Sequence, residues 1–195
     1  MAFNRMVING FGLLLVLIFE SFSQIGLAMA AKSSDNLRPE KTDPYVVAFA
    51  QDNLRNDFRR AQVAEVKQEL APYRDIRFIH SDAQGKTSLL IHQIKEFTLQ
   101  KVDVLIVGTN DAHLVVPVIE EAHEKGIKVL ILDRGVETRM YTSFLNSDNV
   151  LIGRMAGKFI AGKLNGKGQV LLMEGLKTAD VTQHRTKGFM DVMAQ

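Results

Sequence analysis

The stretch VDVLIVGTNDAHLVVPVIEEAHEKGIKVLILDRG, residues 102–135, decides the fold. Two apolar runs, 102–108 and 127–133, flank a segment whose apolar residues recur at helical spacing and which Gly126 ends. Two buried strands joined by a helix indicate a parallel pair with a crossover connection. Because such crossovers are right-handed, the pattern predicts a doubly wound α/β sheet.

The same alternation extends outward from this unit along the chain. The further predicted elements are strands over 45–51, 75–82 and 141–146, and helices over 57–73 and 87–97. Strands separated in this way by helices imply a sheet that is covered on both faces. The sequence therefore predicts one N-terminal α/β lobe over residues 45–146.

Residues 147–195 continue the pattern but do not complete it. Ser147 or Asp148 can cap a helix that ends near residues 164–168, and a sixth strand is predicted over 169–175, followed by a helix over 180–195. One strand between two helices cannot form a sheet-based core. We expect these residues to be the incomplete start of a C-terminal lobe.

The first thirty residues have the order of a secretory signal peptide. Arg5 precedes an apolar run over residues 13–19, and small residues follow at 28–30. The run is too short to cross a bilayer, which takes about 20 residues, so a retained membrane anchor is the weaker alternative. Residues 31–44 are polar and without periodicity, and are predicted to be a mobile leader.

The composition excludes several classes of function. The formal net charge is only +2, without long blocks of one sign, so nothing indicates nucleic acid or an anionic membrane as a partner. The chain has no cysteine, which excludes disulfides, a thiol nucleophile and a cysteine-based metal site. We expect an exported protein that is stabilised by its core and does not insert into the membrane after signal cleavage.

Two motifs suggest phosphate or metal binding but lack the partner residues that such sites need, and a third motif, for nucleophilic catalysis, is absent. Gly85, Lys86 and Thr87 resemble the end of a phosphate-binding loop, but His80 stands where its first glycine is needed. Glu120 and His123 share a helix face, but no further ligands converge on them. No G-x-S-x-G motif is present. The sequence therefore predicts no enzyme, no metal and no cofactor.

The polar residues that follow the strands indicate a binding site. Ligands of doubly wound sheets bind beyond the carboxyl ends of the strands. Asn56, Phe58 and Arg59 follow the first strand, Asn110 the third, and Asp133 with Arg134 the fourth. Such a mixture of donors, acceptors and an aromatic ring suits a small polyhydroxylated ligand.

Structural roles compete with binding at several of these positions. Asp111 and Asp148 are predicted to be helix caps rather than ligand contacts, and either Asn56 or Asp57 is a candidate cap of the first helix. Phe58 is also a candidate core residue. Asp133 and Arg134 can instead form an internal ion pair.

Four motifs carry a resemblance to a known family. In order they are LDRGVE, NSDNVLIGRMAGKFIAGKLNGKG, QVLLMEG and HRTKGF. Over residues 45–195 the chain resembles the type I periplasmic sugar-binding proteins, in particular the ribose- and galactofuranose-binding group. The resemblance implies a two-lobed periplasmic protein that closes on one sugar, without chemistry, and presents it to the permease of an ABC importer or to a membrane sensor.

The resemblance also implies roles for individual residues. Asp133 and Arg134 would hydrogen-bond sugar hydroxyls, and Phe58 would stack on the ring. Asn56 matches a polar contact of the ribose-type pattern, and Arg59 a basic contact of the galactofuranose type. Arg185 matches an arginine of the second lobe.

Some positions depart from the family's pattern. Arg59 replaces a second aromatic residue of the ribose-type members, which argues against ribose itself. Gly108 replaces an asparagine, and whether Asn110 takes over its role is open. The family's pattern also continues beyond residue 195, so we expect a truncated second lobe. Import of a sugar and sensing of a sugar both remain hypotheses.

Overall fold

The structure is a computed structural model that describes residues 43–194. The predicted signal peptide over residues 1–30, and the predicted leader up to residue 42, lie outside the described residues. Within residues 43–194, no helix has the length and apolar character needed to cross a membrane.

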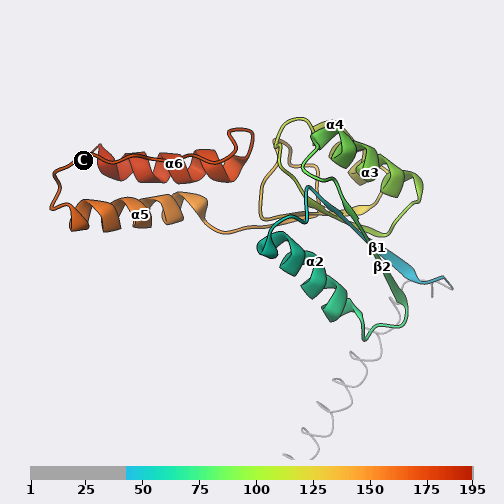
Figure 1. The fold of residues 1–195 in the computed structure, drawn as a ribbon. Coiled ribbons are helices and arrows are strands. Elements are labelled where there is room, and N and C mark those ends of the chain that lie inside the picture. The colour runs from blue at the N-terminus through green and yellow to red at the C-terminus, as the bar shows by residue number, and fades with distance from the viewer. Residues whose placement is uncertain (1–42, 195) are drawn as a thin grey trace, which may run out of the picture. The chain divides into compact units, whose positions relative to one another are not determined.

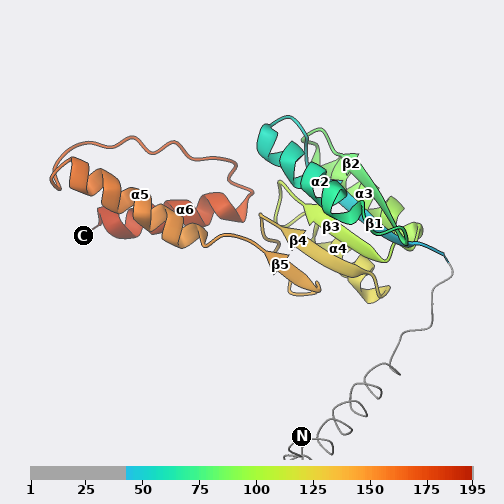
Figure 2. The same cartoon turned by 90° about the horizontal axis from the view of Figure 1, so that it is seen from below.

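Five parallel strands form one sheet, in the spatial order β2-β1-β3-β4-β5. The strands are β1 (Tyr45–Gln51), β2 (Ile76–Asp82), β3 (Val104–Gly108), β4 (Lys128–Leu132) and β5 (Ser143–Leu145). Figure 2 shows the sheet from β2 to β5. This sheet, crossed over by helices, confirms the predicted doubly wound α/β fold.

Helices cover both faces of the sheet, as Figure 1 shows. The helices are α2 (Asp57–Leu70), α3 (Thr87–Leu99) and α4 (Val116–Glu124). Because successive strand side chains point to opposite faces, Val47 and Phe49 pack with α2, whereas Ala48 and Ala50 pack in the core under α3 and α4. The alternation in β1 thus builds two cores from one strand.

The chain leaves β1 and β3 in opposite directions across the sheet. β1 leads through α2 to β2, and β3 leads through α4 to β4 on the other side. The loops after β1 and β3 therefore separate, which opens the crevice where doubly wound folds bind ligands. Gly108 ends β3 beside Gln51, and a Cβ at Gly108 would lie 2.1 Å from Gln51 Oε1. Only glycine leaves room there for the Gln51 side chain.

Helices α5 (Asn149–Lys163) and α6 (Asp180–Met193) pack side by side. Glycines let their backbones approach closely: a Cβ at Gly153 would lie 2.1 Å from Arg185 O, and one at Gly188 would lie 2.0 Å from Val150 O. Asp148 caps α5 by accepting from Leu151 N, which confirms one of the predicted caps. The predicted lobe boundary near residue 146 stays a prediction.

The predicted sixth strand over residues 169–175 is wrong. Residues 168–176 form neither strand nor helix, and their side chains are exposed. A strand is stable only when a neighbouring strand takes up its hydrogen bonds. Within residues 43–194 all strands belong to one sheet, whose edge strands are β2 and β5, and residues 169–175 do not pair with it. An apolar sequence alone does not supply that neighbour.

One helix start differs from the sequence prediction, and the structure decides between the two candidate caps of another helix. α4 begins at Val116, five residues after the predicted cap Asp111, because Asp111 Oδ1 accepts from His113 N and Leu114 N and caps a separate turn. The α2 cap is Asn56, whose side chain accepts from Arg59 N.

Substitution of Gly153 by Ala should loosen the helix pair. The added Cβ meets backbone, which cannot rotate away as a side chain can, and overpacking of this kind costs about 1–3 kcal/mol. We expect the amides of α5 and α6 to exchange with deuterium about tenfold faster, as measured by mass spectrometry. The control is Gly162→Ala, because a Cβ at Gly162 in α5 meets nothing within 4 Å. Equal protection in the two variants would contradict the close packing.

Candidate functional site

Four charged residues meet beyond the carboxyl ends of β1 and β4. We call Asp52, Arg59, Asp133 and Arg134 the strand-end cluster. Arg59 Nη1 lies 3.1 Å from Asp133 Oδ2, and Arg59 Nε lies 3.4 Å from Asp52 Oδ1. Arg134 Nη1 lies 3.3 Å from Asp52 Oδ2. Acid and base therefore alternate through three ion pairs that link α2 to the exits of two strands.

Arg59 is the buried centre of the strand-end cluster, with its side chain only 2% exposed. It lies in the first turn of α2, which its own backbone N–H anchors by donating to Asn56 Oδ1 at 2.9 Å. Its Nη1 also donates to Gln62 Oε1 at 3.0 Å. A guanidinium that is removed from water in this way needs such partners on several sides.

Asp133 holds its position through an unusual backbone. Its φ is 69°, in the left-handed region that Asp tolerates better than most residues. Its N–H donates to Leu145 O at 2.8 Å, which ties the exit of β4 to β5. The side chain is 23% exposed. A carboxylate has about four acceptor sites, so the Asp133 carboxylate can accept from Arg59 and from a ligand hydroxyl together.

Arg134 is also partly exposed, at 21%. Its Nη1 donates to Thr109 O at 3.3 Å in addition to its contact with Asp52. Burial, and then repulsion by Arg59, lower the pKa of Arg134 below its usual value, while Asp52 and two other carboxylates oppose the change. Arginine nevertheless stays charged at neutral pH. Asp133 and Arg134 thus pair with other residues of the cluster, and the predicted ion pair between the two of them is not formed.

Phe58 is exposed next to the cluster. Its side chain is 59% exposed, so the alternative that it is a core residue is wrong. The guanidinium carbon of Arg59 lies 5.7 Å from the centroid of the Phe58 ring. The structure therefore brings together an aromatic ring, two arginines and two carboxylates.

Two other predicted residues have their own structural partners. Asn56 uses its side-chain oxygen as the α2 cap. Asn110 accepts from Thr87 Oγ1 at 3.1 Å and donates to Gly85 O at 3.1 Å, so its amide is directed to the loop before α3. Binding by these two residues would compete with those contacts and stays a prediction.

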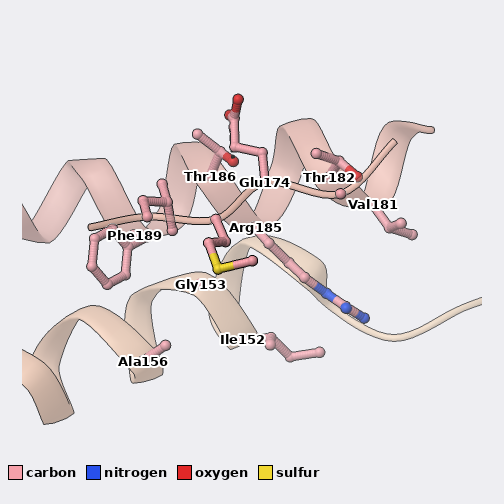
Figure 3. Close-up of a pocket in the computed structure, with 12 residues that line it drawn as sticks. Ile152, Gly153, Ala156, Glu174, Val181, Thr182, Arg185, Thr186 and Phe189 are labelled. Carbon is pink, nitrogen blue, oxygen red and sulfur yellow. Dashed lines mark hydrogen bonds between the residues drawn. The ribbon is translucent and has the colours of Figure 1, made fainter. Parts of the chain in front are cut away.

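Arg185 belongs to the helix pair. Its Nε donates to Asn149 Oδ1 at 2.8 Å. It also lines a pocket of about 290 Å³ between α5, α6 and residues 172–175, which Figure 3 shows with Phe189 and Glu174. Apolar side chains supply most of the lining, and Glu174, Thr182 and Arg185 add polar groups.

Sequence reasoning missed Asp52. The residue directly follows β1 and is 1% exposed, with one carboxylate oxygen toward each arginine. Its position at a strand exit was a usable signal, but a polar residue there is normally exposed, and only the fold shows that this one is buried.

No cluster that could hold a metal occurs within residues 43–194. Glu120, one of the two residues of the metal-like spacing, instead accepts from Thr138 Oγ1 at 2.6 Å.

Comparison with known proteins gives consistent relatives. A ribose import binding protein of Bacillus subtilis is 29% identical over 151 residues, which are 77% of this chain and 49% of the relative. A galactofuranose-binding protein of Escherichia coli is 30% identical over 154 residues, with 77% and 48% covered. The chain thus spans about half the length of the curated relatives that it matches.

Solved structures share the same fold. The fructose-binding periplasmic domain of a hybrid two-component system superposes with a TM-score of 0.74 at 30% identity, over 77% of this chain and 50% of that domain. The family described as the periplasmic binding protein domain matches residues 47–195. On these grounds the chain belongs to the periplasmic binding protein domain family.

Proposed function

We propose that this chain is the sugar-binding part of an exported periplasmic protein that delivers a small carbohydrate to the permease of an ABC importer. The protein binds its ligand without changing it. The observation that carries the proposal is the strand-end cluster, because Asp133 and Arg134 are held at the edge of the sheet and stay partly open to solvent.

The chemistry of these groups matches a sugar. A hydroxyl group both donates and accepts, so neighbouring hydroxyls can donate to the Asp133 carboxylate and accept from the Arg134 guanidinium. The exposed ring of Phe58 offers an apolar surface for the C–H face of a sugar ring. Arg59 stands beside Phe58, in the arrangement that the resemblance to galactofuranose-binding proteins implies.

The names of the relatives support this proposal. Both curated relatives are named as sugar-binding proteins, and one of them as an import protein. Since the chain spans about half of each, import itself is a proposal for the whole protein.

Sensing is the second candidate function. It is favoured by the similarity to the sugar-binding domain of a two-component system. In that case the partner would be a membrane sensor. A neighbouring permease gene would support import, whereas a neighbouring kinase gene would support sensing.

A thermal-shift and NMR screen of the chain against neutral pentoses, hexoses and polyols tests the proposal. We expect at least one of them to shift the signals of residues 133–134. For that ligand, Asp133→Asn should weaken binding about tenfold to a hundredfold, because a hydrogen bond to a charged group contributes about 1.5–3 kcal/mol. Titration by NMR measures the affinity, and circular dichroism checks that the variant is folded.

The control for this substitution is Glu121→Gln. It removes a carboxylate that is paired with Lys125 on the exposed surface of α4, a helix that contributes no residue to the cluster. Affinity should be unchanged in this variant. An Asp133→Asn variant that binds as tightly as the original chain would exclude Asp133 as a ligand contact.

Phe58→Ala should weaken sugar binding about tenfold without lowering the melting temperature, because the ring is already exposed in the folded protein. The matched control is Tyr73→Ala, which removes an equally exposed ring from the turn after α2. Dye-based thermal melts and ligand titrations measure both quantities. If the two variants bind alike, Phe58 does not stack on the ligand.

A further inference from the structure

One buried carboxylate stands between the two arginines of the strand-end cluster. Asp52 Oδ1 faces Arg59 Nε at 3.4 Å, and Asp52 Oδ2 faces Arg134 Nη1 at 3.3 Å. The two arginines come from different parts of the chain, one from α2 and one from the loop after β4. Asp52 is the only member of the cluster that pairs with both of them.

The position of Asp52 is fixed by several hydrogen bonds. Its N–H lies 2.8 Å from Gly108 O and 3.1 Å from Gln51 Oε1, and its carbonyl accepts from Gly85 N at 2.7 Å. Asn53 Nδ2 donates to Asp52 Oδ2 at 2.9 Å. Hydrogen bonds therefore tie the backbone of Asp52 to the end of β3 and to the loop before α3, and Asn53 holds its carboxylate, which is how supporting groups keep a residue in place.

Without this carboxylate the two guanidinium groups would repel each other. Arg59 already lowers the pKa of Arg134, and Asp52 is first among the groups that oppose this effect. Arg59 is too buried to move away. Arg134 is partly exposed, and its remaining hydrogen bond, to Thr109 O, is 3.3 Å long. Loss of Asp52 would thus turn Arg134 toward solvent.

Asp52 also sets the charge that a ligand would meet. The three ion pairs of the cluster join two cations and two anions, which sum to zero. Asp180, at the start of α6, also acts on Arg134 and adds a negative charge. Two arginines at a binding site would otherwise attract anions such as sugar acids.

We propose that Asp52 is a positioning residue that orients Arg59 and Arg134 and, by its charge, makes the site reject anionic sugars in favour of uncharged ones. The orienting role stands on the geometry alone. The selectivity rests on the proposed function.

The orienting role is tested without a ligand, in the full chain with Asp52→Asn. The side-chain Nε–Hε signals of Arg59 and Arg134 are followed by NMR, assigned with Arg134→Lys. In the original chain we expect both protons to exchange slowly. In the variant both signals should shift, and that of Arg134 should exchange at least about tenfold faster because it is released toward solvent.

Asp57→Asn is the matched control. It removes a carboxylate five residues away that pairs with Arg60 at the exposed start of α2. The signals of Arg59 and Arg134 should not change in this control. If Asp52→Asn also leaves both unchanged, the orienting role is overturned.

Selectivity is tested with pairs of ring sugars that differ by one carboxylate, D-galactose with D-galacturonate and D-glucose with D-glucuronate. Asp52→Asn raises the charge of the site by one unit, so the affinity ratio should shift about tenfold toward the acid of a pair. A merely structural loss would weaken both members of a pair equally and would overturn the inference. Binding of no sugar by any variant would instead overturn the proposed function, while the arginine signals still test the orienting role.

A second variant covers the case in which Asp52→Asn does not fold. Asp52→Asn combined with Arg134→Gln removes one charge of each sign and should fold, because no unpaired arginine is left beside Arg59. If this double variant also fails to fold, Asp52 acts through its packing and not its charge, and the inference is overturned.

Discussion

The strand-end cluster depends on one buried cation. Arg59 has almost no contact with water, and a buried charge that loses its partner costs about 3–5 kcal/mol. Its partners therefore have to be in place whenever the lobe is folded. These partners, Asp52 and Asp133, follow β1 and β4. Along the chain Asp133 lies 74 residues after Arg59 and 81 residues after Asp52, so folding brings distant loops together. The ion pairs that stabilise Arg59 thus also fix the geometry of the strand-end cluster.

The topology explains why this cluster lies where it does. β1 and β3 are neighbours in the sheet, but their chains continue to opposite sides. The space between the departing loops has to be filled, and Gln51, Asp52 and Arg59 fill it with polar groups. Gly108 contributes by having no side chain, which leaves room for Gln51. A cluster made in this way is held by strands and a helix, so the fold itself positions its polar groups.

Much of this could be predicted from the sequence. The alternation of apolar runs with helical periodicity predicted the parallel sheet, and position at a strand exit predicted Asp133 and Arg134. The role of Asp52 could not be predicted, because burial at a strand exit depends on a helix that packs from elsewhere. Residues 169–175 show the opposite error, since an apolar run becomes a strand only beside another strand. Pairing and burial are properties of the fold, and local pattern does not contain them.

The exposed ring of Phe58 has a practical consequence. The chain contains no tryptophan, so an indole introduced at position 58 would be the only one and would emit without background. It would lie at the edge of the sheet, in water and beside a guanidinium group that can alter its emission. The same feature that suits this position to contact a ligand would thus make it a built-in optical reporter of whether the crevice is occupied.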